Sequence, residues 1–83
     1  MTGIRGHAGA ILCELEAGLR RRGVVGLYGA ASAPYGVLSV APGLTVWCDG
    51  TRLSWATGGR WAFWPASDPE GAAEELAKLT TTR

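Results

Sequence analysis

Apolar and polar residues alternate through the middle of the chain, between Val37 and Trp64. Such alternation is typical of β-strands that bury one face. Two dipeptides interrupt the pattern, Asp49-Gly50 and Gly58-Gly59. Both favour tight hairpin turns, because these residues tolerate a positive φ. The pattern therefore predicts an antiparallel meander in this part of the chain.

Pro42-Gly43 allows two interpretations. If these residues form a hairpin turn, each face of the flanking strands mixes apolar and polar side chains. If the chain runs through as one bent strand, the faces separate cleanly, and an ordinary type II Pro-Gly turn also has the wrong twist for a tight hairpin. We therefore expect one long strand that is kinked at Pro42, at an edge of the sheet. Its core-face residues would be Leu38, Val40, Pro42, Leu44, Val46 and Cys48.

A two-residue loop at Asp49-Gly50 would set the register of the next hairpin. In that register Trp47 lies opposite Arg52 on the second face of the sheet, where we expect a cation–π contact. The apolar residues of both strands then meet on the core face, so the turn chemistry and the face pattern support each other. The expected core-face pairs are Val46 with Leu53 and Leu44 with Trp55.

The register of the last hairpin stays open at this point. A two-residue loop at Gly58-Gly59 leaves Trp61 and Phe63 on the second face. A loop that is one residue longer reverses this assignment and turns Trp64 outward. In either case Trp47 shares the second face with at least one further tryptophan.

Helical periodicity marks the first part of the chain. Apolar residues recur at three- and four-residue spacing and predict a helix over about residues 6–22. Three arginines at 20–22 suit the negative end of that helix. A strand with two glycines is expected over Val24–Ala31, followed by a turn at Ser32–Pro34.

A second helix is expected near the C-terminus. Asp68 is a suitable N-cap, and Pro69 suits the first helical position. An apolar side then runs to Leu79. We thus predict an α+β fold in which residues 1–83 form one domain, ordered as helix, four-stranded antiparallel meander and helix, with both helices on one face of the sheet.

Composition and charge restrict the function classes. The net charge of +1 gives no general attraction to nucleic acid or acidic lipid, so a nucleic-acid partner is not favoured. The chain offers no export signal or membrane span, and we expect a cytoplasmic protein without membrane contact. In that setting Cys13 and Cys48 are expected to be reduced and buried.

Candidate catalytic and metal-binding residues are few. His7 is the only imidazole, and no serine or cysteine stands in a recognisable nucleophile motif. The acidic pairs Glu14/Glu16 and Glu74/Glu75 lie on helices, where such neighbours point apart. No short Cys or His spacing suggests a metal site. We therefore expect no enzymatic activity, no metal and no cofactor.

Three segments resemble a group of small actinobacterial proteins. They are the hairpin at 44–50 (Leu-Thr-Val-Trp-Cys-Asp-Gly), Trp-Ala-Thr-Gly at 55–58, and the helix start at 65–73 (Pro-Ala-Ser-Asp-Pro-Glu-Gly-Ala-Ala). The resemblance extends roughly from Leu12 to Leu79, and the chain departs from the group at 41–43. Because some members are encoded near helix-turn-helix regulators, the resemblance implies a regulatory role.

The tryptophan distribution gives the main functional hypothesis. A second sheet face that no helix covers would expose an apolar patch, and such patches usually mark protein contacts. We expect a non-enzymatic interaction or regulatory module that uses this face or the edge strand to form a homodimer or bind a partner protein. A small-molecule binding module is the alternative, and a nucleic-acid-associated regulatory protein is a minor one. The candidate interaction face comprises Trp47, Arg52, Trp61, Phe63 and Tyr35.

Overall fold

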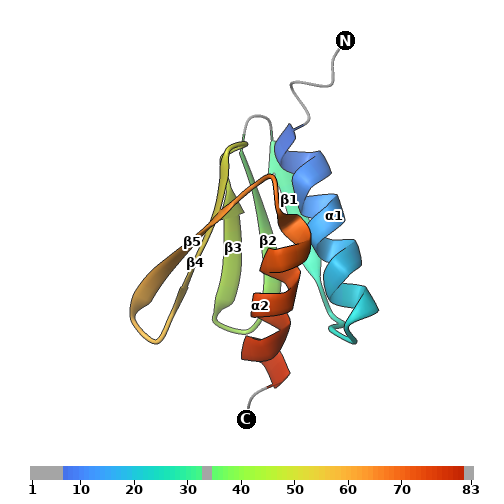
Figure 1. Ribbon diagram of the computed structural model, residues 1–83, viewed down its shortest axis with the longest axis vertical. Helices are drawn as coiled ribbons and strands as arrows, with labels where there is room; N and C mark the ends of the chain where they lie inside the picture. Colours follow the sequence, from blue (N-terminus) through green and yellow to red (C-terminus); the bar gives the residue numbers. More distant parts are fainter. Residues whose placement is uncertain (1–6, 33–34, 82–83) are drawn as a thin grey trace.

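Two helices and five antiparallel strands make up the computed structural model, which describes residues 7–32 and 35–81 (Figure 1). Both helices lie on the same side of the sheet, so the predicted α+β class and the helix–sheet–helix order are confirmed. The strands follow one another across the sheet in chain order, from β1 to β5. The elements are α1 (His7–Arg21), β1 (Tyr28–Ser32), β2 (Tyr35–Ala41), β3 (Leu44–Cys48), β4 (Arg52–Thr57), β5 (Arg60–Pro65) and α2 (Pro69–Thr81).

The predicted boundaries hold in part. The expected strand at Val24–Ala31 begins later, at Tyr28. The expected turn at Ser32–Pro34 lies partly outside the described residues, as does the expected helix start at residue 6.

The prediction of one bent strand through Pro42-Gly43 is wrong. These residues form the turn between β2 and β3, and Gly43 has the positive φ of 80° that the third residue of a type II turn requires. The sheet therefore has five strands instead of four, and both β2 and β3 are interior strands.

A β-bulge explains why the hairpin does not mix its faces. Leu38 pairs with Val46 and Ala41 pairs with Leu44, so the register shifts between Ser39 and Ala41. The extra residue restores the apolar side chains of β2 and β3 to one face. It also supplies local twist next to a turn whose own twist is unsuitable for a tight hairpin.

The register of the β3–β4 hairpin differs from the predicted one by two residues. Val46 pairs with Trp55, and Trp47 pairs with Ser54 instead of Arg52. The turn is centred one residue later than expected, because Asp49 flanks it: the Asp49 N–H donates to the Arg52 carbonyl over 3.3 Å. Since two residues are a full period of a strand, the predicted core face survives this error.

The last hairpin has the two-residue Gly58-Gly59 loop. Both glycines have positive φ, 61° and 80°, as a type I′ turn requires. Thr57 pairs with Arg60, so Trp61 and Phe63 lie on the face away from the helices.

One hydrophobic core fills the space between the sheet and the helices. The helices approach closely at Gly18, where an added Cβ would lie 2.9 Å from the Ala73 Cβ. Leu79 departs from the prediction, since it was assigned to the buried side and is 39% exposed. The largest fully buried side chains are Leu15, Leu19, Leu38, Leu53, Leu76, Val46 and Cys48.

Candidate interaction face

The side of the sheet away from the helices carries five exposed aromatic side chains. Each keeps more than half of its surface accessible, so none of the five is part of the core. We call these residues, together with Arg52, the aromatic face. The exposed fractions are 52% for Trp47, 55% for Phe63, 59% for Trp61, 64% for Tyr35 and 74% for Tyr28.

Trp47 occupies the middle of this face. One row of paired residues crosses all five strands, with Val37 on one side of Trp47 and Ser54 on the other. Ser54 in turn pairs with Phe63 on the edge strand β5. Neighbouring strands lie about 4.8 Å apart, so the backbones at Trp47 and Phe63 are roughly 10 Å apart with only a small side chain between them. The two rings can therefore contact the same bound surface.

Arg52 is the charged member of the aromatic face. Its guanidinium carbon lies 4.6 Å from the centre of the Phe63 ring. The expected contact with Trp47 is therefore wrong, because the shifted register pairs Arg52 with Pro65 and brings it beside β5. A cation over an exposed ring is worth about 0.5–1 kcal/mol. Arg52 makes no ion pair within the described residues, and its guanidinium lies over an exposed ring of the aromatic face.

Asp49 fixes the turn from which Arg52 emerges. One oxygen of its carboxylate, Oδ1, accepts hydrogen bonds from the backbone N–H of Thr51, from the Thr51 hydroxyl and from the Arg52 N–H, each at 2.9 Å. These bonds lower the pKa of Asp49 below its usual value of 3.8, and the bond from the Thr51 N–H contributes most. A side chain bonded in this way belongs at the start of a turn instead of its centre.

The other two tryptophans lie on the helix side of the sheet. Trp55 is buried, and its ring stacks on Trp64 with centroids 6.3 Å apart. The Trp64 indole donates to Asp68 Oδ2 over 3.1 Å, while Asp68 Oδ1 accepts the Gly71 N–H over 3.1 Å. Asp68 is thus the predicted N-cap and also anchors Trp64. Both tryptophans therefore contribute to the packing of the fold.

Tyr28 was not among the predicted residues of the face. Its pairing with Ser39 places it on the same side of the sheet as Trp47. Two glycines in the surrounding segment obscure the alternation from which a face could be assigned. Its assignment also needed the β1–β2 register, which the sequence does not reveal.

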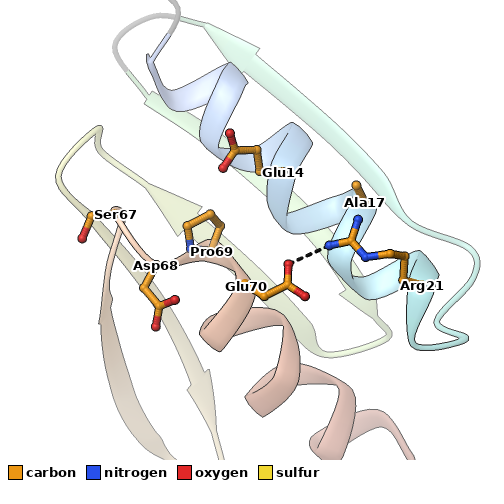
Figure 2. A pocket seen from close by; sticks show the side chains of 7 residues that line it. All are labelled: Glu14, Ala17, Arg21, Ser67, Asp68, Pro69 and Glu70. Atoms are coloured by element: carbon orange, nitrogen blue, oxygen red, sulfur yellow. Dashed lines mark hydrogen bonds and ion pairs between the residues drawn. The ribbon is translucent and has the colours of Figure 1, made fainter.

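A groove between the helices is the second candidate site (Figure 2). It has a volume of about 300 Å³ and lies where the start of α2 meets α1. Glu70 in this groove pairs with Arg21 at 2.6 Å and with Arg22 at 2.8 Å. The hydrogen bond from Arg22 is the main cause that lowers the pKa of Glu70 below 4.5. Most of the charged groups of the groove are therefore engaged within the fold.

The arginine triplet at the end of α1 has partners inside the protein. Arg20 pairs with Glu16, one helical turn earlier, and the other two arginines contact Glu70 on α2. Arg21 and Arg22 therefore join the end of α1 to α2, in addition to complementing the helix dipole.

The two cysteines differ in their surroundings. Cys48 is buried as predicted, and burial raises the pKa of its thiol above 9.0. The prediction for Cys13 is wrong, because Cys13 is exposed on α1. The described part of the chain has no group of three His, Cys, Asp or Glu side chains that could bind a metal ion. Within the same residues, no helix is long and apolar enough to cross a membrane.

Comparisons with protein families, with curated proteins and with solved structures gave no match for this chain.

Proposed function

We propose that this protein is a non-enzymatic interaction module whose aromatic face binds an apolar surface of a partner protein. One observation carries the proposal: five aromatic side chains, each more than half exposed, share a sheet face that neither helix covers. Several exposed large apolar side chains on one face of this kind usually mark a protein contact.

The composition of the face supports a protein partner. Tryptophan, tyrosine, phenylalanine and arginine are enriched in protein interfaces, and tryptophan, tyrosine and arginine dominate their binding energy. Trp47 lies at the centre of the face, where such dominant residues cluster, and Arg52 adds one cation near its rim. A partner that places a carboxylate opposite Arg52 and an apolar side chain beside Trp47 would complement both features.

The small-molecule alternative has less support. Four open hollows, with volumes between about 190 and 370 Å³, are lined by residues elsewhere on the molecule. None of the five exposed aromatic side chains lines any of these four hollows. A ligand pocket normally encloses most of its ligand, whereas the aromatic face presents its rings outward.

Affinity capture followed by reconstitution tests the proposal. A protein captured from the native host would be purified and titrated against the parent chain and against Trp47→Ala. A residue that dominates an interface costs at least about 2 kcal/mol on truncation, so the Kd should rise about thirtyfold. Val25→Ala is the matched control, because Val25 is 80% exposed and lies outside the aromatic face. Equal losses in both variants, or no loss in Trp47→Ala, would refute the proposal.

A further inference from the structure

We propose that two copies of the chain pair through the outer edges of their β5 strands and form one continuous ten-stranded sheet. The inference concerns the edge of the sheet and does not depend on what binds the aromatic face. It starts from the position of β5, which is the last strand of the sheet and has a neighbour on one side only among the described residues.

The hairpin geometry identifies the residues whose backbone groups point outward. In a two-residue hairpin, the residues that flank the loop exchange both backbone hydrogen bonds, and the pattern then alternates along the strands. Thr57 and Arg60 flank the loop, so Ala62 and Trp64 direct their N–H and C=O groups toward β4. Trp61 and Phe63 consequently direct theirs outward.

The middle of this edge lacks the protection that edge strands normally have, because the charge of Arg60 and the proline at 65 lie only at the two ends of β5. Natural edges are blocked by charges, prolines, bulges or covering elements. Here the residues between Arg60 and Pro65 read Trp-Ala-Phe-Trp without a charge or proline. β1, on the opposite edge, has α1 packed against it, whereas β5 packs extensively only against β4. In Figure 1 the β4–β5 hairpin extends away from both helices.

One antiparallel register uses both outward-facing residues of each copy. With Ala62 opposite Ala62 of the second copy, Trp61 lies opposite Phe63 of the second copy, and Phe63 lies opposite Trp61 of the second copy. A register centred on Trp61 would place Phe63 opposite Gly59, which lies in the turn. A register centred on Phe63 would place Trp61 opposite Pro65, which has no N–H and whose carbonyl already accepts the Asp68 N–H. The Ala62-centred register alone satisfies both residues.

The side chains agree with a second copy as the occupant. On the open side of the sheet, Trp61 and Phe63 would form two aromatic cross-strand pairs, which are among the favourable pairs in antiparallel sheets. On the helix side, Arg60 would lie opposite Trp64 of the second copy, whose indole already contacts the Asp68 carboxylate. Arg60 makes no ion pair within the described residues, so a cation–π contact there would use a free charge.

A charge-pairing experiment at the twofold axis tests the proposal. In sedimentation equilibrium the parent chain should show about twice its mass of 8.7 kDa. Ala62→Lys and Ala62→Glu each place like charges opposite each other across the interface, so self-association should weaken about tenfold or more in either variant. An equimolar mixture of the two should restore a dimer that contains one of each. Doubled mass in both single variants, or no dimer in the mixture when circular dichroism shows each variant folded, would overturn the proposal.

Amide hydrogen exchange in the unmodified chain tests the same register without a substitution. In the dimer the Trp61 and Phe63 amides are protected, and their protection should fall on dilution, while the Ala62 amide stays protected at all concentrations. Fast exchange of Trp61 and Phe63 at high concentration, with a single mass of 8.7 kDa, would refute the dimer. Trp47→Ala should leave the dimer intact, so failure of the proposed partner binding and failure of this inference give different results.

Discussion

The two sides of the sheet each carry two of the four tryptophans, but in opposite situations. On the helix side Trp55 is 3% exposed and stacks on Trp64, whose indole N–H has a carboxylate partner. On the open side Trp47 and Trp61 are more than half exposed. Burial of a large ring stabilises the fold, whereas an exposed ring contributes little to folding and much to binding. The same residue type therefore serves stability on one side and is available for contact on the other.

The largest effect should come from removing the buried ring. Trp55→Ala deletes a side chain that is surrounded by the core, and such truncations cost about 3–5 kcal/mol. Urea unfolding followed by circular dichroism measures this loss. In a chain of this size such a loss approaches the whole stability, so a partly unfolded variant at 25 °C is also consistent. A loss below about 1 kcal/mol would contradict the assignment of Trp55 to the core.

Asp68 should give the next largest effect, because it joins the start of α2 to Trp64. Asp68→Ala removes the N-cap acceptor and the indole partner together and should cost about 1–2 kcal/mol of unfolding free energy. Asp68→Asn keeps one acceptor oxygen and should retain the cap while losing the bond to Trp64, so its loss should be smaller. Equal losses in both variants would show that the cap contributes nothing.

Trp47→Ala should change the unfolding free energy by at most about 1 kcal/mol, since the side chain lies across from Ser54 and half of it faces solvent. Urea unfolding of Trp47→Ala and Trp55→Ala under the same conditions measures this change in free energy. A loss as large as that of Trp55→Ala would erase the difference between the two faces.

Acid should produce the smallest effect. Asp49 and Glu70 have pKa values lowered in the folded protein by hydrogen bonds to their carboxylates. Their contribution to the unfolding free energy is therefore complete above their usual pKa values of 3.8 and 4.5. It is lost as the pH falls through the lower pKa values of the folded protein. The urea concentration at the unfolding midpoint should decrease once the pH drops below about 4.5, and it should decrease less in Glu70→Gln. A midpoint that is independent of pH between 6 and 3 would contradict both contacts.

The sequence predicted the two faces better than the connections between strands. Alternation assigned Leu44, Val46 and Trp55 to the core because a period of two survives any register error of two residues. Strict alternation missed the bulge at Val40, because Val40 and Ala41 are consecutive residues that both lie on the core side, whereas alternation places Ala41 on the other face. The wrong prediction of one bent strand through Pro42-Gly43 followed directly from the unrecognised bulge.

The composition of the aromatic face shows the same limit. Trp47 was assigned to this face from alternation and turn chemistry, and Trp61 and Phe63 followed from one of the two loop lengths left open at Gly58-Gly59. Together with Tyr35, all of them are exposed. The partner of Arg52 was wrong, because the Asp49 side chain shifts the turn by one position. Side-chain hydrogen bonds of this kind are visible only once the turn is built.

The indole N–H signals of the four tryptophans show directly which face of the sheet binds the partner. In a nitrogen-15 spectrum each indole reports on its own surroundings, and the partner obtained by capture can be titrated into the labelled chain. If the aromatic face binds the partner, the Trp47 signal shifts or broadens on binding and the Trp55 signal stays in place. Movement of Trp55 with an unchanged Trp47 would show instead that contact occurs on the helix side.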